Sequence, residues 1–578
     1  MRSRVSALLV NYAGYPSSPN SLMPDNGLAS LAGKLKGAGH QVKVMDYATV
    51  GTMRRLVPPF FQKRLTDVLR SFEQTMGEKS PSRRDKARQA MAFLKLKLLA
   101  RGLEVVRRSE ERKIAKEIAA AVREADANFV GFKLWNGDGF SGPMRIVSYL
   151  RRRFPDLFIA AGGPQVKFFR DRIFDFTQDF DALAIGDGEA AILPLAEAAL
   201  GRNLSEVPNI FYLKDGIFPV FSLGKRVNRM DDLPFPLYDA ETYPALAGNE
   251  KIKMLVVEDR RGCENVCYFC VHPFLSGADP RSKSAARVVN EFQDALEKYG
   301  ISSFRLGGSS SPPRMLMGVA REIEARGMDV NWTAFARIKD SHPEDFEYLK
   351  RSGLFSLFFG IESGNQNVLD RMNKNVKLER IREVIAASKA AGIFTVGSVI
   401  YPAPFDTAET REETLAFLKE VRPDSVPLQF LGVYPSTEYA RHPEKHNLEI
   451  VYPSRFANLL ARMGLKKKAA FDDAEVQRYL LEYKIQLLFP PEFWAPLPWR
   501  INSLAHKQFA AETQGLYEDL KKAGILTMLT DEEALMAHLG GYSPREFADE
   551  AFVNSFTGNW ERAAEMARKI NDRILKKE

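Results

Sequence analysis

Three cysteines are the residues whose type and spacing most directly indicate chemistry. Cys263, Cys267 and Cys270 are the only cysteines in the chain and lie within the segment RGCENVCYFC. An odd, clustered set is a poor disulfide framework. Three thiolates on one tight loop can instead hold an iron–sulfur cluster in which one iron keeps an open position. The competing interpretation is structural zinc with His272 as a fourth ligand, but Pro273 follows it and the spacing is not that of a zinc finger.

The cysteine loop directly follows a predicted strand, and this strand begins an alternation of strands and helices. Six βα units predict a partial (β/α)6 barrel of the TIM type, which we place at residues 251–445, with its chemistry at the carboxyl ends of the strands. A helical stripe from Val288 to Tyr299 ends at Gly300 and represents the helices between the strands. The predicted barrel strands are residues 252–258, 302–306, 330–336, 354–361, 394–400 and 425–431.

Residues 1–220 show a similar alternation and predict a Rossmann-like domain with a parallel sheet. The motifs Gly162-Gly163-Pro164 and Gly186-Asp187-Gly188-Glu189 follow predicted strands, where such sheets form a ligand crevice, although paired glycines can also be simple turns. An extended linker is predicted at 221–250 and a mainly helical domain at 446–578. The fold class is therefore α/β. The predicted N-terminal strands are residues 7–12, 41–46, 128–134, 157–161 and 181–185.

A basic helical insertion of about residues 52–126 separates the second and third strands. Residues 81–124 carry thirteen Lys or Arg against six Asp or Glu, out of a net charge of +9 for the whole chain. A solvated helical face is the interpretation we favour, with contact to RNA or anionic lipid left open. Nucleic acid is not the expected partner.

Composition restricts the class of protein further. The chain has 578 residues, 45% of them hydrophobic and 27% charged, which excludes disordered, collagen-like and disulfide-rich proteins. No apolar run approaches the roughly 20 residues that a transmembrane helix needs. The short apolar stretch near the N-terminus is interrupted by Asn11 and Tyr12 and predicts a strand rather than a signal peptide. We therefore expect a cytoplasmic protein.

The spacing Cys-x3-Cys-x-Phe-Cys resembles the signature of the radical S-adenosylmethionine (radical SAM) enzymes. The resemblance implies a [4Fe–4S] cluster on Cys263, Cys267 and Cys270, with SAM bound to the iron that has no protein ligand. It continues along the predicted barrel, where it assigns SAM-binding roles to Phe269, Gly307, Gly308, Arg337, Glu362 and Ser363.

Each of these barrel assignments rests on a short motif. Gly307-Gly308 is similar to the second-strand glycines that accommodate the methionine amine of SAM, and Arg337 to an arginine that pairs with its carboxylate. Glu362 and Ser363 belong to a fourth-strand GIES motif, in which a polar side chain contacts SAM. The fifth strand departs from the pattern, because YPAPFDT at 401–407 stands where relatives usually have Gly-x-Pro-Gly-Glu-Thr.

The N-terminal half resembles the cobalamin-binding domain fused to one large radical SAM subgroup. The similarity lies in PDNGL at 24–28, in Gly39-His40-x-Val42 and in the two glycine motifs, while Phe132-x-Leu134 replaces a Ser-x-Leu. The Asp-x-His-x-x-Gly motif that supplies a cobalt ligand is absent, which implies base-off cobalamin without a histidine ligand. The resemblance and the strand-end positions assign cobalamin contacts to Leu134, Trp135, Asn136, Gly162, Gly163, Gly186 and Gly188.

The resemblance implies hydrogen abstraction by a 5′-deoxyadenosyl radical. The first hypothesis is a methyltransferase that moves a methyl group from SAM through methylcobalamin to an unactivated carbon. The alternative is a non-methylating cyclase or rearrangement enzyme. A sensor without turnover is disfavoured by the cysteine loop together with the SAM motifs, and a methylthiotransferase by the lack of further N-terminal cysteines.

Substrate and partners are less constrained. We expect a small-molecule or lipid-like substrate and a flavodoxin- or ferredoxin-type electron donor, and no individual catalytic residue can be assigned. By position at the end of the sixth strand, Gln429, Phe430 and Tyr434 are predicted to line the substrate cavity. The segment Leu487–Trp499, rich in aromatic residues and proline, could wall an apolar pocket or touch a membrane, although interdomain packing is the favoured interpretation.

Overall fold

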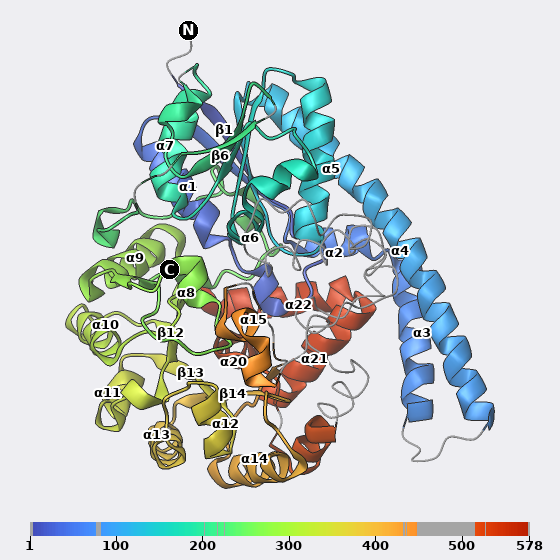
Figure 1. Cartoon of the computed structure of the whole chain (residues 1–578), viewed down its shortest axis with the longest axis vertical. Helices are drawn as coiled ribbons and strands as arrows, with labels where there is room; N and C mark the ends of the chain where they lie inside the picture. Colours follow the sequence, from blue (N-terminus) through green and yellow to red (C-terminus); the bar gives the residue numbers. More distant parts are fainter. Residues whose placement is uncertain are drawn as a thin grey trace.

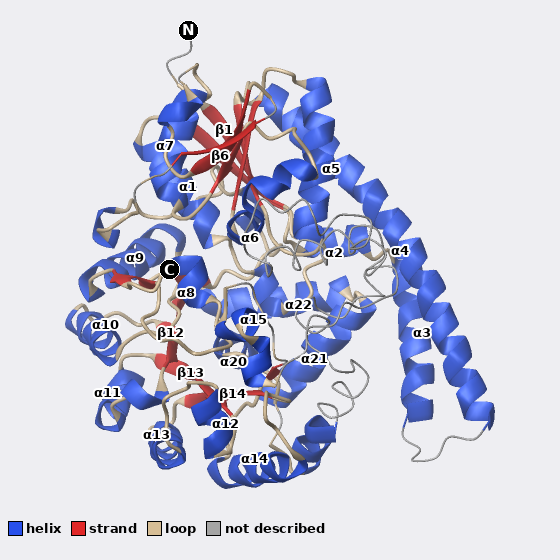
Figure 2. Cartoon of the chain, in the orientation of Figure 1, coloured by secondary structure: helices blue, strands red, loops and turns tan. Residues whose placement is uncertain are grey.

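The protein is built from two sheets stacked end to end, with helices around both (Figure 1, Figure 2). The computed structural model describes residues 4–76, 83–447 except 202, 217, 223, 225, 430, 432, 433 and 435, and 515–575 except 526. The segment Leu487–Trp499 and Phe430 therefore lie outside the described residues. None of the described helices is both long and apolar enough to cross a bilayer.

The N-terminal sheet has seven strands in the order β2-β1-β3-β4-β5-β6-β7. The first five are parallel, and each lies within one residue of its predicted ends, which confirms the Rossmann-like prediction. The antiparallel hairpin β6–β7 was not predicted, and its second strand occupies the first two positions of the expected linker. The strands are β1 (Ser6–Asn11), β2 (Gln41–Asp46), β3 (Phe129–Lys133), β4 (Phe158–Gly162), β5 (Ala182–Ala184), β6 (Ile210–Lys214) and β7 (Phe218–Ser222).

Helices cover both faces of this sheet, which explains its nearly continuous apolar strands. Successive side chains of a strand point to opposite faces. Ala7 and Leu9 accordingly share a core with α1 and α7, whereas Leu8 and Val10 share one with α4 and α5. The helices are α1 (Asn26–Gly37), α5 (Asp138–Arg153), α6 (Pro164–Phe169) and α7 (Gly188–Ala198).

The basic insertion forms three helices, α2 (Val50–Leu56), α3 (Pro59–Met76) and α4 (Arg83–Glu124). The end of α4 packs against the N-terminal sheet through residues such as Ile114 and Ile118, both fully buried. The start of α4 and the whole of α3 instead form a hairpin that projects from the body at the right of the view (Figure 1). The long helix predicted at 81–124 is thus confirmed.

The second sheet has six parallel strands in the order β15-β14-β13-β12-β11-β8, as the barrel prediction requires. Its two edge strands are shorter than expected, and a small antiparallel pair, β9 (Arg260–Arg261) with β10 (Arg281–Ser282), encloses the cysteine loop. The strands are β8 (Leu255–Val257), β11 (Ser303–Leu306), β12 (Asn331–Ala336), β13 (Leu354–Glu362), β14 (Phe394–Ile400) and β15 (Leu428–Gln429).

Amphipathic helices follow the barrel strands and bury one side against them. In α9, for example, Val288, Val289, Phe292 and Ala295 are buried, and the helix ends at Gly300 in the left-handed conformation. The helices of this part are α8 (His272–Ser276), α9 (Ala285–Tyr299), α10 (Pro313–Ala325), α11 (Phe346–Arg351), α12 (Gln366–Arg371), α13 (Leu378–Ala390), α14 (Ala408–Val421) and α15 (Glu438–Arg441).

The described C-terminal part is helical, as predicted, and packs against the barrel. Helix α20 (Asp531–Gly540) begins with a capping box of Thr530 and Glu533 and lies against β12, β13 and β14. Helices α21 (Pro544–Thr557) and α22 (Trp560–Ile574) follow it. The buried Asn571 of α22 hydrogen-bonds the backbone on both sides of Ile252, so the end of the chain is fixed beside the first barrel strand.

Candidate functional site

The cysteine loop is anchored at its start and in its middle. The Cys263 amide donates to the Gly277 carbonyl at 3.0 Å, and the Tyr268 amide donates to the Met372 carbonyl at 3.1 Å. Gly262, which precedes the loop, has a φ of +89°, and a Cβ there would lie 2.7 Å from the Gly277 oxygen. Only glycine fits this turn, so the local sequence determines where the loop leaves the barrel.

The three thiols face a shared environment without forming a disulfide. The Asn265 amide lies 3.6 Å from the Cys263 sulfur, and Nη1 of Arg337 lies 3.9 Å from the Cys267 sulfur. Burial, with smaller contributions from the other two cysteines, raises the pKa of Cys270 to about 11. Thiols gathered in this way ionise readily only beside positive charge, which bound iron supplies.

The positions of the cysteines and of nearby acidic and histidine side chains can be compared with the ligand sets of a zinc ion and of an iron–sulfur cluster. Among the described residues, no three His, Cys, Asp or Glu side chains converge on the position of a single ion. A structural zinc ion needs four such ligands at about 2.0–2.3 Å, whereas a cluster of several irons accepts ligands that stand further apart. The cysteine loop therefore fits a cluster better than it fits zinc.

The glycine pair after β11 is fixed by a carboxylate that sequence reasoning missed. Asp259 is fully buried and accepts hydrogen bonds from the Gly308 amide at 2.7 Å and from the Ser311 hydroxyl at 2.7 Å. A Cβ on Gly308 would lie 2.5 Å from that carboxylate, and one on Gly307 would lie 2.6 Å from Val256. Burial raises the pKa of Asp259. Both glycines are therefore required by close packing beside the cysteine loop.

Arg337 and Glu362 lie near the cysteine loop, as their assigned roles require. Besides its approach to Cys267, Arg337 donates to the Lys374 carbonyl at 3.4 Å. The Lys374 ammonium lies 2.8 Å from the Glu362 carboxylate, which is 6% exposed. Glu362 has a φ of +69° at an irregularity of β13, a strained conformation that non-glycine residues adopt mainly at functional sites. No sequence signal pointed to Lys374.

Phe269 lies beside Lys374, whereas Ser363 has other partners. Lys374 lies 5.9 Å from the centre of the Phe269 ring, so this ring belongs to the same group of side chains. The Ser363 hydroxyl is buried, accepts from the Asn365 amide at 3.1 Å and lies 3.3 Å from the Thr414 hydroxyl. Its described contacts are therefore with the loop that follows β13 and with α14.

A small cavity of about 310 Å³ lies beside the cysteine loop, and Arg260 and Arg337 both line it. The buried Nε of Arg260 has no hydrogen-bond partner among the described residues, and the guanidinium of Arg337 is paired there with Asp340 at 3.4 Å. Hydroxyl groups of Ser310 and Ser311 also line the cavity. Glu264, which pairs with Arg260, and Asp340 also line the cavity, so it presents both cationic and acidic groups, as the carboxylate and amine of an amino acid such as the methionine part of SAM require.

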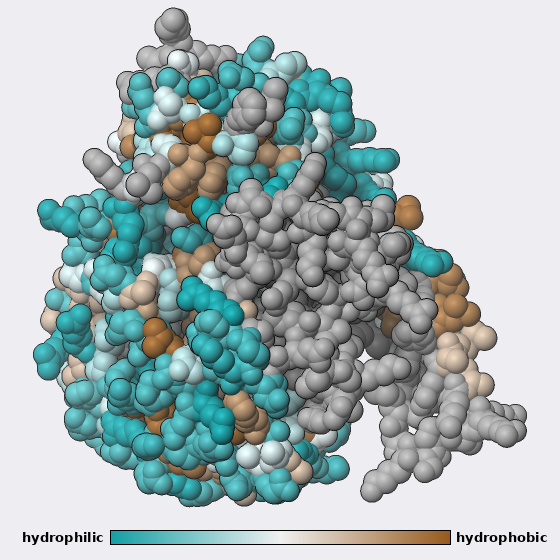
Figure 3. Space-filling model, in the orientation of Figure 1, coloured by the Kyte–Doolittle hydropathy of each residue, from teal (hydrophilic) through white to brown (hydrophobic). Residues whose placement is uncertain are grey.

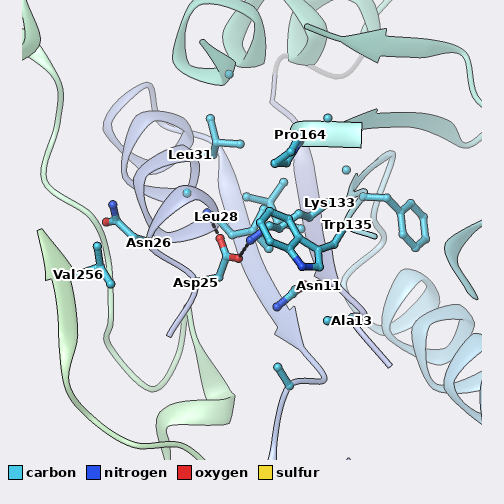
Figure 4. Close-up of a pocket in the computed structure, with 18 of the residues that line it drawn as sticks. Asn11, Ala13, Asp25, Asn26, Leu28, Leu31, Lys133, Trp135, Pro164 and Val256 are labelled. Atoms are coloured by element: carbon cyan, nitrogen blue, oxygen red, sulfur yellow. Dashed lines mark hydrogen bonds and ion pairs between the residues drawn. The ribbon is translucent and has the colours of Figure 1, made fainter. Parts of the chain in front are cut away.

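A larger cavity, of about 940 Å³, lies between the two sheets (Figure 4). The ends of β1, β3, β4 and β5 contribute to it from the N-terminal domain, and the ends of β8 and β11 contribute from the barrel. Parallel α/β sheets bind ligands outside the carboxyl ends of their strands. The carboxyl ends of both sheets therefore open into one space.

Six of the seven residues assigned to cobalamin line this cavity, namely Trp135, Asn136, Gly162, Gly163, Gly186 and Gly188. Leu134 does not line it, because its side chain is fully buried in the domain core. Gly163 has a φ of +107°, and its Cβ would lie 2.8 Å from the Leu134 oxygen, so only glycine fits there. Gly186, with a φ of +81°, has open space beside it.

An ion pair that was not predicted lies in the cavity wall. Figure 4 shows the Lys133 ammonium pointing at the Asp25 carboxylate, with which it forms an ion pair. The Trp135 ring lies beside Lys133. Asp25 also accepts from the Leu28 amide at 2.9 Å and so caps α1. Burial disfavours its ionised form, but Lys133 and the Leu28 amide outweigh this and hold the pKa of Asp25 below its usual range.

A second charged network joins the N-terminal domain to the cysteine loop. Arg261, two residues before Cys263, lies 2.6 Å from Glu189 and 3.1 Å from Asp187. Arg281, on the paired strand β10, lies 2.5 Å from Asp187. The acidic residues of the Gly186–Glu189 motif, which lines the large cavity, thus bind both strands that enclose the cysteine loop.

The C-terminal part contributes a third charged group. Arg305 of β11 lies 3.0 Å from Glu532 and 3.3 Å from Asp531, and Arg305 and Glu532 both line the large cavity. Burial and the neighbouring Glu532 raise the pKa of Asp531 well above its usual value. Thr333 of β12 donates to Asp531 at 2.8 Å, so α20 is fixed by its first turn against the interior of the barrel.

Gln429 and Tyr434, which were predicted to line the substrate cavity, line neither of the two cavities described above. Gln429 is exposed at the end of β15. Tyr434 is partly buried, which raises the pKa of its hydroxyl. Phe430 lies outside the described residues.

Taken together, the structure combines a Rossmann-like sheet, a six-stranded parallel sheet and a three-cysteine loop whose flanking residues Arg261 and Leu275 line the cavity that the two sheets share. Residues 257–418 match the family model described as the Radical SAM superfamily. The central barrel therefore belongs to the Radical SAM superfamily.

Known proteins of this class are similar over more of the chain. An uncharacterized methyltransferase of Pyrococcus horikoshii is 24% identical over 57% of this chain and 72% of its own length. The anaerobic magnesium-protoporphyrin IX monomethyl ester cyclase of Rubrivivax gelatinosus is 24% identical over 47% of this chain and 50% of its own. The match thus spans only half of the cyclase.

Among solved structures, the fold is similar to that of the radical S-adenosylmethionine methyltransferase TsrM from Kitasatospora setae with cobalamin and a [4Fe–4S] cluster bound. The TM-score is 0.60 at 16% identity, over 95% of this chain and 99% of that one. At this identity the likeness shows the fold alone. It confirms the predicted arrangement of a Rossmann-like domain, a radical SAM barrel and C-terminal helices.

Proposed function

We propose that this protein is a cobalamin-dependent radical SAM enzyme, and that it is a methyltransferase acting on an unactivated carbon. The observation that carries the proposal is the shared cavity, into which the carboxyl ends of both sheets open beside the cysteine loop. A substrate in that space would be accessible from both cofactor sites. The similarity to two methyltransferases, one by sequence and one by fold, supports the choice of reaction.

The residues present fit the three cofactors. The cysteine loop would hold a [4Fe–4S] cluster, and the 310 Å³ cavity with Arg260 and Arg337 would accept the amino-acid end of SAM. The 940 Å³ cavity is large enough for a corrin, and Gly163 and Gly186 would let the backbone approach it closely. No described residue that lines this cavity is a histidine. Base-off binding without a histidine ligand stays a prediction from the missing sequence motif.

When bound, the cluster with SAM would supply a 5′-deoxyadenosyl radical, and cobalamin would supply the methyl group. The protein's part is to position the cofactors and the substrate and to exclude water. Asp259 holds the Gly307–Gly308 turn in place through two hydrogen bonds, and Lys374 neutralises the buried Glu362 beside the cysteine loop. Leu9, Phe129 and Ile192 contribute apolar surface to the large cavity, where a radical must be protected from solvent.

The test uses anaerobically reconstituted protein loaded with cobalamin, a chemical reductant in place of the flavodoxin- or ferredoxin-type donor we expect, and SAM with a deuterated methyl group. We expect the label in the cobalamin fraction together with S-adenosylhomocysteine, both detected by mass spectrometry. Cys267→Ala is the matched control for radical chemistry, because it removes one cluster ligand and should abolish formation of 5′-deoxyadenosine. If bound cobalamin never acquires the label, the methyltransferase proposal fails.

A second candidate is a non-methylating cyclase or rearrangement enzyme that uses the same cofactors. The observation that favours it is the similarity to the Rubrivivax gelatinosus cyclase over 281 residues. In the same experiment this candidate predicts 5′-deoxyadenosine without label in the cobalamin fraction. The predicted roles of Gln429, Phe430 and Tyr434 as substrate-lining residues stay predictions for either reaction.

A further inference from the structure

The projecting hairpin of α3 and α4 carries an exposed apolar stripe that the proposed function does not use. Met91, Leu94, Leu98 and Val105 of α4 are 51–69% exposed. In a helix of 3.6 residues per turn, positions 91, 94, 98 and 105 lie on one face. Figure 3 shows apolar side chains along the outer edge of this hairpin. A contiguous apolar surface on a projecting element usually marks a binding site.

Cations flank this stripe on both sides. At about 100° of rotation per residue, Arg88 and Lys95 lie on one edge of the stripe, and Arg101 and Arg108 lie on the opposite edge. All four side chains are exposed. Among the described side chains of residues 87–109, none of the exposed ones is acidic. Glu104, which is partly buried, forms ion pairs with Arg107 and Arg108.

We infer that α4 binds the surface of an anionic lipid bilayer, with the stripe of residues 91–105 inserted between the headgroups and the flanking cations at the phosphates. A helix with an apolar face bordered by Lys and Arg lies flat in the membrane interface, where the aliphatic stems of the cations cover apolar surface and their charged ends remain in water. Each cation near an anionic surface adds to the attraction.

The charge pattern distinguishes this occupant from a second copy of the chain. Two α4 helices packed through their stripes would bring the rows of Arg88, Lys95, Arg101 and Arg108 of both copies together without exposed acidic partners. Like charges at the flanks of a helix pair oppose association. The stripe also lies on the outer surface of one projecting helix, so a flat surface can reach it. The inference is independent of the reaction in the cavity.

The test is co-sedimentation of the full chain with vesicles of phosphatidylcholine alone or mixed with phosphatidylglycerol. We expect binding to the mixed vesicles that weakens as salt is raised. Leu94→Glu with Leu98→Glu should lower the bound fraction by roughly tenfold or more, and so should Lys95→Glu with Arg101→Glu. The matched control is Arg314→Glu with Arg321→Glu, which reverses two exposed cations on α10 and should leave binding unchanged.

Hydrogen exchange localises the contact, and we expect protection at residues 87–109 when mixed vesicles are added. Equal binding to neutral and mixed vesicles would overturn the proposal, as would binding that both α4 variants retain. A dimer in light scattering that Leu94→Glu with Leu98→Glu converts to monomer would also overturn it, because the stripe would then be an interface between copies. Melting curves of each variant check that the fold is unchanged.

Discussion

Buried charged side chains lie in the wall of the large cavity, and Asp25 is one of them. It is both the cap of α1 and the partner of Lys133 in the cavity wall. The sequence motif PDNGL drew attention to this position, but its partner lies 108 residues further along the chain. The pairing depends on β3 lying beside β1, which the local sequence around Asp25 does not encode.

Asp25→Asn is predicted to lower the melting temperature at neutral pH, because it leaves Lys133 without its carboxylate while asparagine still caps the helix. The pKa of Asp25 is lowered in the folded protein, so its ionised form stabilises the fold above its unfolded pKa of about 3.9. That contribution disappears as the pH falls through the lower folded pKa. The difference in melting temperature between parent and variant should thus be constant from about pH 8 to 5 and shrink below about pH 4. A difference that grows in acid would contradict this assignment.

Several residues of the candidate site follow from sequence motifs and others do not, for a physical reason. The cysteines, Gly307, Gly308 and Arg337 stand at fixed offsets from strands, so their order along the chain carries the information. Asp259 and Lys374 act through contacts made only after folding, and neither forms part of a motif that sequence reasoning used.

At the scale of elements, parallel strands were predicted well because burial on both faces leaves an apolar run with clear ends. The parallel strands β1–β5 show this, whereas the hairpin β6–β7 at the sheet edge and the two-residue strands β9 and β10 were missed. Asp187 binds Arg261 of β9 and Arg281 of β10, so this pair of strands is supported by charged contacts rather than by a hydrophobic pattern. The docking of α20 on the barrel likewise depends on Arg305, far away in the sequence.

The loop between β4 and α6 offers a sharp prediction about cobalamin. Gly163→Ala places a Cβ 2.8 Å from the Leu134 carbonyl at a φ of +107°, which should cost about 1–3 kcal/mol in strain and displace the loop. Gly37→Ala is the matched control, because its Cβ would meet nothing within 4 Å, its φ is not positive and it does not line the large cavity. We expect Gly163→Ala to reduce cobalamin retention at least tenfold with the cluster intact, and Gly37→Ala to leave cobalamin retention unchanged, as measured by visible absorption after gel filtration. Equal retention in both variants would remove this loop from the cobalamin site.

At the scale of the whole molecule, three parts of the chain converge on one cavity, and charged contacts fix them there. The N-terminal domain reaches the cysteine loop through Asp187 and Glu189, and the C-terminal helix α20 reaches the barrel interior through Asp531 and Glu532. Two apolar cores run through the molecule, one of them shared by all three parts, and these ion pairs link the same parts beside the cavity. A cavity built between domains depends on such contacts for its shape.

Arg261 is the residue on which the relative orientation of these parts should depend most. Arg261→Met leaves Glu189 and Glu258 without a described cationic partner and removes one of the two described cationic partners of Asp187, and breaking a buried pair costs about 3–5 kcal/mol. Hydrogen exchange should become faster at residues 186–190 and 260–278 together, and less iron should be retained after cluster reconstitution. Arg568→Met is the control, since it breaks an exposed pair on α22 whose contribution is small. If exchange in the cysteine loop stayed at the parental rate while the 186–190 segment loosened, the network would be a local support of one domain and not the link between the two cofactor sites.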